Sequence, residues 1–154
     1  MLGKVIKYNR RNDNIKSKYI TLKDNAYAYS QSSLSFVLRN SLVEEGERIY
    51  YFDVFITVEN IKYKLKIALF DSDFDNLKGF KYGTPISECY FIEPDFHLTV
   101  LHFGDEDLVV YVNIDSGLRY ANVATESGIA IKLNVTKDKF DHFINQLLSI
   151  NDAY

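Results

Sequence analysis

The sequence is poor in features that mark several common protein classes. Its single cysteine, Cys89, excludes an intramolecular disulfide framework and a multi-cysteine metal site, which suits a reducing compartment. No apolar run approaches the roughly 20 residues that a membrane helix requires. The segment from Met1 to Arg11 also lacks the apolar stretch of a secretory signal. We therefore expect a cytoplasmic protein with no membrane partner.

Motifs for catalysis and nucleotide binding are also missing. There is no Gly-x-Ser-x-Gly, Walker loop or dinucleotide fingerprint, and 7 scattered glycines cannot cradle a phosphate chain. His97-Leu98-Thr99 matches one His-x-Thr element of two-histidine phosphoesterases, but neither His102 nor His142 restores the second copy. The histidines and the cysteine include no close ligand pair that could seed a zinc site. We expect no enzyme and no cofactor; a phosphodiesterase that uses His97 and Thr99 is the weakest alternative.

Aromatic and β-branched residues are what the sequence has in abundance. The 12 Tyr and 11 Phe, with no Trp and only 2 Pro, favour a pleated, half-buried surface. A chain of 154 residues fits one domain, so residues 1–154 are interpreted as a single unit with a frayed basic N-terminus at 1–15. No internal repeat or linker is evident. The expected fold class is therefore α+β and β-dominated.

Alternating patterns predict about seven to nine strands in mostly antiparallel sheets. In Ile61 to Phe70 the apolar residues face one way and the lysines the other, so one face is buried and the other is solvated. Tyr50 and Tyr51 are neighbours on a strand and must point to opposite faces. Strands are also expected at 4–8, 18–23, 26–38, 48–58, 87–92, 96–102, 108–114 and 128–135.

The final element is expected to be an amphipathic helix at 136–150. Its apolar residues recur at spacings of three and four, which places on one helical stripe Phe140, Phe143, Ile144, Leu147 and Leu148. Thr136 is the expected N-cap, with a hydroxyl that satisfies an orphan backbone N–H. Earlier in the chain, the spacing of Phe74, Leu77 and Phe80 allows a helical turn that ends at Gly79.

Charge is distributed unevenly along the chain. Residues 1–23 carry a net charge of +6, so residues 24–154 carry −9. An acidic body steers a basic partner, because complementary fields raise association rates. It argues against nucleic acid as the main partner, since phosphate binding needs clustered Lys and Arg. We therefore expect a basic protein partner.

Two acidic clusters and one tyrosine are the expected partner-binding residues. They are Asp71, Asp73 and Asp75 after the strand at 61–70, Asp105, Glu106 and Asp107 at a hairpin tip, and Tyr82. The first cluster begins like a calcium loop, but Asn76 stands where the sharp turn needs Gly and Tyr82 where a bidentate Glu is required. Both clusters are therefore interpreted as solvent-exposed connections, with no metal.

The order of elements from Arg48 to Leu148 resembles small immunity proteins encoded beside polymorphic or contact-dependent bacterial toxins. The resemblance is carried by Tyr51–Val58, Phe91–Leu98 and Gly128–Ile144. It implies a non-enzymatic cytoplasmic inhibitor that binds a cognate toxin, often a nuclease, and it transfers no catalytic residue. The acidic body agrees, because a nuclease must be basic where it grips phosphate. A phage or mobile-element protein that antagonises host defence, and a small-ligand module on a sheet face, are the alternatives.

Overall fold

The computed structural model describes residues 18–83, 85–93, 95–114 and 128–153, which form two four-stranded antiparallel sheets and two helices. The first sheet has the order β1 (Tyr19–Lys23), β2 (Ser33–Glu44), β3 (Glu47–Val58) and β4 (Ile61–Phe70). The second has the order β5 (Ile86–Tyr90), β6 (Phe96–Phe103), β7 (Asp107–Ile114) and β8 (Ile129–Thr136). Helix α1 (Asp71–Gly79) follows β4, and helix α2 (Lys137–Asp152) follows β8. The predicted β-dominated α+β class and C-terminal helix are confirmed.

The strand expected at 26–38 begins later, at Ser33. The carboxylate of Asp24 accepts hydrogen bonds from the Ala26 backbone N–H at 3.2 Å and from the Ser30 hydroxyl at 2.6 Å. Such bonds from a side chain to nearby residues favour a turn over a strand. The residues before β2 therefore form a loop, although their composition suggests a strand.

Strand β2 also runs further than expected, past Leu38 to Glu44. Its register with β3 shifts between Leu38 and Asn40, which makes Arg39 an extra residue in a β-bulge. A bulge redirects side chains without ending the strand, so the sheet continues beyond it. The strand expected at 4–8 and the basic segment 1–15 lie outside the described residues.

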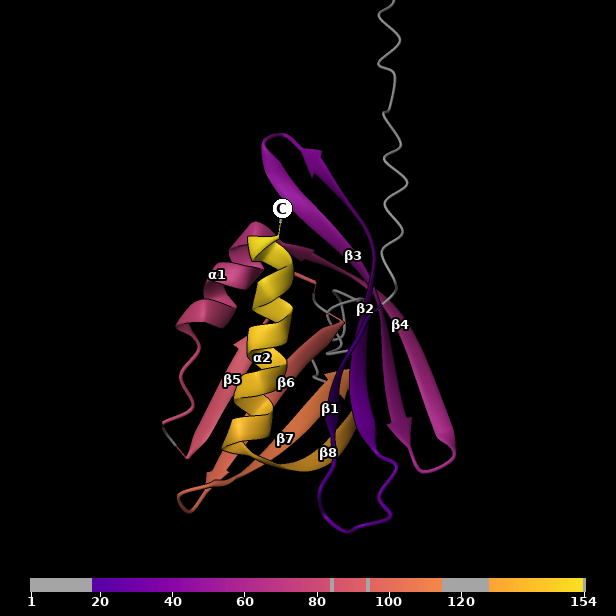
Figure 1. Ribbon diagram of the computed structural model, residues 1–154, viewed down its shortest axis with the longest axis vertical. Coiled ribbons are helices and arrows are strands. Elements are labelled where there is room, and N and C mark those ends of the chain that lie inside the picture. Colours follow the sequence, from indigo (N-terminus) through magenta and orange to yellow (C-terminus); the bar gives the residue numbers. More distant parts are fainter. Residues whose placement is uncertain (1–17, 84, 94, 115–127, 154) are drawn as a thin grey trace, which may run out of the picture.

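Each sheet is a meander of four strands followed at once by a helix, so the second half of the chain repeats the architecture of the first (Figure 1). The helices also correspond at their first turns. Their fourth residues are Phe74 and Phe140, their seventh residues are Leu77 and Phe143, and all four side chains are buried. No repeat is evident in the sequence because the shared pattern reduces to a few buried positions that many helices have in common.

One hydrophobic core joins both sheets and both helices. The ring of Phe36 on β2 lies 5.6 Å from that of Phe52 on β3, 5.7 Å from Phe96 on β6 and 5.9 Å from Phe143 on α2. Edge-to-face pairs of this kind contribute about 0.5–1.5 kcal/mol beyond their burial. Figure 1 shows α1 and α2 side by side along the sheets. The core therefore depends on contacts between residues far apart in the sequence.

The two sheets meet where the end of β1 lies beside β8. The Asn25 backbone N–H donates to the Asn134 carbonyl at 2.8 Å, and the Asp24 carboxylate accepts the Asn134 N–H at 2.6 Å. Burial opposes ionisation of Asp24, but hydrogen bonds from Ser30, Asn134 and Ala26 outweigh it and lower the pKa of the carboxyl. Asp24 therefore joins the two halves as a carboxylate.

The start of α2 differs from the expectation in one respect. Thr136 is the N-cap residue, as predicted, but its hydroxyl makes no capping hydrogen bond. Instead, the Lys137 backbone N–H donates to the Glu106 carbonyl at 2.9 Å. The predicted role of the hydroxyl was wrong, because tertiary packing places a backbone acceptor from the β6–β7 turn at this helix end.

Candidate partner-binding surfaces

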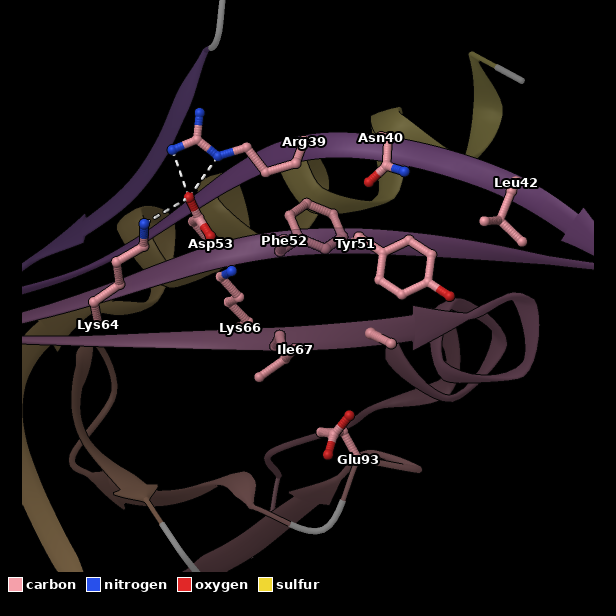
Figure 2. A pocket seen from close by; sticks show the side chains of 11 residues that line it. Arg39, Asn40, Leu42, Tyr51, Phe52, Asp53, Lys64, Lys66, Ile67 and Glu93 are labelled. Atoms are coloured by element: carbon pink, nitrogen blue, oxygen red, sulfur yellow. Dashed lines mark hydrogen bonds and ion pairs between the residues drawn. The ribbon is translucent and has the colours of Figure 1, made fainter. Parts of the chain in front are cut away.

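A groove of about 680 Å³ lies along the outer face of the first sheet, the face turned away from the core. Side chains from three strands line it, with Glu93 from the β5–β6 loop across from them (Figure 2). These strand residues are Arg39, Asn40, Leu42, Tyr51, Phe52, Asp53, Lys64, Lys66, Ile67 and Ala68. Tyr51 lines the groove while Tyr50 is 1% exposed in the core, so the two tyrosines point to opposite faces as predicted.

A carboxylate with two cations forms the polar centre of this groove. Asp53 Oδ2 accepts from Arg39 Nε and Nη2, both at 2.5 Å, and from Lys64 Nζ at 3.1 Å (Figure 2). Asp53 is 5% exposed, whereas the Arg39 and Lys64 side chains are about half exposed. Burial raises the pKa of Asp53, but bonds and charges from Lys64 and Arg39 outweigh it and lower the pKa overall. Two cations therefore share one carboxylate.

A row of lysines makes the rest of this face basic. Lys62, Lys64 and Lys66 are exposed on alternate residues of β4. The ammonium of Lys62 lies 4.7 Å from the centroid of the Phe55 ring, and that of Lys64 lies 5.5 Å from it. Such cation–π contacts hold the lysine stems over the sheet while the charges stay in solvent. The outer face of the first sheet is therefore basic, although the chain as a whole is acidic.

The first predicted acidic cluster is not a single exposed surface. Asp73 is fully buried, and its carboxylate accepts the backbone N–H groups of Phe70 at 2.9 Å and Ile92 at 2.8 Å. Burial raises the pKa of Asp73 despite these two donors. The prediction that Asp73 faces solvent was wrong, because residues 71–79 form a helix in which Asp73 shares a face with Leu77.

Its two neighbours lie differently. The Asp71 carboxylate accepts the Arg48 backbone N–H and the Asn151 side-chain amide, each at 3.0 Å, so it joins α1 to β3 and α2. Asp75 is 78% exposed and lies 3.9 Å from Lys78. Of the three residues, Asp75 is the exposed one, and its described ion pair with Lys78 lies within α1.

The second predicted cluster is a surface feature. Asp105, Glu106 and Asp107 are all exposed at the β6–β7 turn, beside the first turn of α2. Tyr82, in the connection between α1 and β5, packs against the same helix: its hydroxyl donates to Asp141 and its ring lies 5.4 Å from that of Phe140. Burial, followed by the bond to Asp141, raises the pKa of Tyr82. The structure thus places these two predicted elements along the N-terminal half of α2, away from Asp71 and Asp73.

His97 and His102 do not lie on one face of their strand. His97 is 5% exposed, its ring stacks on Tyr90 at 4.8 Å, and its Nδ1 has no hydrogen-bond partner among the described residues. Thr99 lies two residues on and accepts a hydrogen bond from Asn113 at 3.0 Å. His102 lies five residues from His97, so it points to the opposite face of β6.

Two further features bear on chemistry. Burial, with a smaller contribution from the charge of Asp73, raises the pKa of the Cys89 thiol to about 12, so the thiol stays protonated at neutral pH. Within the described ranges, no three His, Cys, Asp or Glu side chains gather closely enough to hold a metal ion.

Neither α1 nor α2 combines the length and apolarity needed to cross a membrane.

Sequence reasoning missed the groove and its polar centre. The sequence pattern predicts only a solvated face for the lysine row, and the predicted strand ends at Leu38, before Arg39, because a bulge leaves no signal in the alternation. One signal was available: Asp53 interrupts the apolar run Tyr50–Val58 and falls opposite Lys66 once the β3–β4 hairpin is paired. A carboxylate there needs cationic neighbours on the outer face of the sheet.

Comparisons with known proteins assign neither this fold nor these surfaces. The chain matches no protein-family model, no curated protein and no solved structure.

Proposed function

We propose that this protein is a non-enzymatic, protein-binding inhibitor that acts in the cytoplasm as an immunity protein. Its partner is a cognate toxin with a basic domain, such as a nuclease, which it blocks through an acidic surface. The observation that carries this proposal is the exposed tip formed by Asp105, Glu106 and Asp107, anchored to α2 by the Lys137–Glu106 hydrogen bond.

The geometry of the tip suits this role. Three carboxylates on a tight turn concentrate negative charge, and the anchored backbone limits the entropy lost when a partner binds. A helix N-terminus is electrically positive and favours acidic neighbours, so the tip also stabilises α2. That internal role needs only part of the charge, and the exposed carboxylates remain available to a basic groove.

The first test concerns the partner. The product of the gene directly upstream is co-expressed with this protein, and growth and co-purification are measured. We expect the upstream product to be toxic alone, to be tolerated with this protein, and to co-purify with it. An upstream product that neither harms the cell nor binds would refute the role as an immunity protein.

The second test concerns the surface. A triple variant with Asp105→Asn, Glu106→Gln and Asp107→Asn is compared with Glu44→Gln, Glu45→Gln and Glu47→Gln at the β2–β3 tip. Both variants remove three negative charges from a hairpin end, so net charge is matched. We expect the first to slow association with the toxin roughly tenfold at low salt and the second to change it little. Equal slowing by both would show that net charge acts rather than the β6–β7 tip.

A further inference from the structure

We infer that the outer edge of β4 is a second docking site, which adds an extended acidic segment of a partner protein as a fifth strand of the first sheet. This site differs from the acidic tip in position and in sign of charge. It therefore goes beyond the proposed function, and it can hold or fail independently of that function.

No described strand pairs with the outer edge of β4, so this edge offers backbone hydrogen-bonding groups to a partner. Among the described residues, β4 ends the first sheet and pairs with β3 alone. The two-residue turn Glu59-Asn60 makes Val58 and Ile61 a closing pair, and hydrogen-bonded pairs recur at every second residue of β4 from there. The N–H and C=O groups of Lys62, Lys64, Lys66 and Ala68 therefore point to the outer edge. Such a row is a template for an added strand.

The side chains at the same positions select the charge of that strand. Lys62, Lys64 and Lys66 stand on the outer face with a spacing of about 6.6–6.8 Å between successive lysines, twice the rise of a strand. In a paired strand, carboxylates on alternate residues lie directly opposite or diagonal to them. The nearby carboxylate of Asp53 is already shared by Lys64 and Arg39, so the row retains positive charge.

The same lysines exclude a second copy of this chain as the occupant. Two β4 edges brought together would align lysine rows of like charge, which is a known means of preventing edge-to-edge association. An acidic strand meets the opposite condition. The lysine row therefore repels a second copy of this chain and attracts an acidic strand.

The groove limits how far acidic residues of the added strand can extend along β4. Beyond Lys66 it is lined by the small side chain of Ala68 and by Tyr51, with Glu93 across from them (Figure 2). The carboxylate of Glu93 disfavours another acidic residue at this end. We expect alternating acidic residues opposite the lysines and a neutral residue opposite Ala68.

The test uses three synthetic peptides and the whole protein. The first peptide is acetyl-Thr-Glu-Thr-Glu-Thr-Glu-Thr-amide, and the second has Gln in place of Glu. The third has the first sequence with N-methyl groups on its Glu residues, whose N–H groups face β4 when they lie opposite the lysines. We expect the first to bind and to slow amide exchange at Lys64 and Lys66, the second to bind roughly tenfold more weakly, and the third not to bind.

Protein variants separate this site from others. Lys64→Gln with Lys66→Gln is expected to weaken the first peptide roughly tenfold. Lys132→Gln, at an exposed lysine on the outer face of the second sheet, is the control for the loss of a lysine elsewhere and should leave binding unchanged. The triple variant of the β6–β7 tip should also leave it unchanged, which keeps this site distinct from the proposed toxin surface.

Three outcomes would overturn the inference. One is equal binding of the N-methylated peptide, which would mean that charge alone attracts it. Another is concentration-dependent dimerisation that masks the amides of β4, which would make a second copy the occupant. The third is stronger binding of a single-stranded oligothymidylate than of the peptide at the same lysines, which would assign the face to nucleic acid.

Discussion

Helix α1 enters the core with a buried carboxylate, Asp73, as its third residue, whereas α2 carries the exposed Lys139 at the matching position. Both helices follow a four-stranded meander and bury an aromatic ring one residue later. The nine-residue α1 adds polar bonds to Phe70 and Ile92, while the 16-residue α2 has an apolar stripe nearly twice as long. The comparison teaches that a short helix can compensate for a small apolar contact with a buried acceptor.

The outer faces of the two sheets also differ, in the charge of the side chains that they present. The first presents a lysine row and the shared carboxylate Asp53 along strands of 10 and 12 residues. The second has strands of at most eight residues and presents mainly neutral groups such as Thr99 and Tyr111. Equal topology therefore does not lead to equal outer faces, and the charged one belongs to the longer sheet.

Replacing the buried ring of Phe143 in α2 should have the largest effect on the free energy of unfolding. Phe143→Ala is expected to lower the free energy of unfolding by about 4 kcal/mol, because it leaves a cavity against Phe36, the ring that also packs on Phe52 and Phe96. Urea unfolding measures the loss. Phe103→Ala, at a 56% exposed ring, is the control and should cost less than about 0.5 kcal/mol. Similar losses from the two variants would contradict a core centred on α2.

Removing the buried carboxylate tests the other helix. Asp73→Ala is expected to lower the free energy of unfolding by about 3 kcal/mol, because the N–H groups of Phe70 and Ile92 lose their acceptor. Lys139→Ala at the matching position of α2 should change it by about 0.5 kcal/mol or less. Equal effects at the two positions would show that the halves anchor their helices alike.

The same variant carries a pH signature. The pKa of Asp73 is raised above the ordinary value of 3.8, so the folded state binds more protons than the unfolded state between 3.8 and the folded pKa. Its contribution to stability is full below 3.8 and is lost as pH rises through the folded value. Asp73→Ala should remove this fall, as urea unfolding at a series of pH values would reveal.

The junction between the halves should respond in the opposite direction. Asp24→Asn is expected to cost about 2 kcal/mol at neutral pH, because an amide cannot accept all the bonds from Ser30, Ala26 and Asn134. The pKa of Asp24 is lowered from 3.8, so its contribution is present above 3.8 and is lost as pH falls through the folded value. The variant should lose less stability than the parent on acidification; an unchanged acid profile would contradict the role of the carboxylate.

The smallest expected effect lies at the β2–β3 turn of the longer sheet. Glu45 has a φ of 51° and is followed by Gly46 at 88°, a left-handed pair for which Asn-Gly is preferred. Glu45→Asn should stabilise the protein by about 1 kcal/mol, measured as a rise in melting temperature. Glu45→Gln removes the charge but keeps the strained backbone, and an equal gain from it would exclude the conformational explanation.

Local patterns predicted much of the fold. The strands at 48–58 and 61–70, the alternation of β4, and the stripe of α2 each depend on residues within a few positions of one another, and the structure contains all three. The start of β2 was missed because Asp24 holds the residues before it in a turn through local bonds to Ala26 and Ser30. The bulge at Arg39 was missed because it is decided by pairing with β3, which lies further along the chain. Asp73 was misplaced for the same reason: its acceptor role requires Ile92, which is distant in sequence.

The sequence by itself determined the identity of the elements and the side of each that is apolar, since periodicity is a property of neighbouring residues. Only the tertiary structure decided which polar groups are buried. Asp24, Asp53 and Asp73 look like surface residues, and each is covered because another strand, loop or helix supplies hydrogen-bond donors or cations to it. The physical reason is that a carboxylate leaves water only where such partners converge, and convergence is set by the packing of the whole chain.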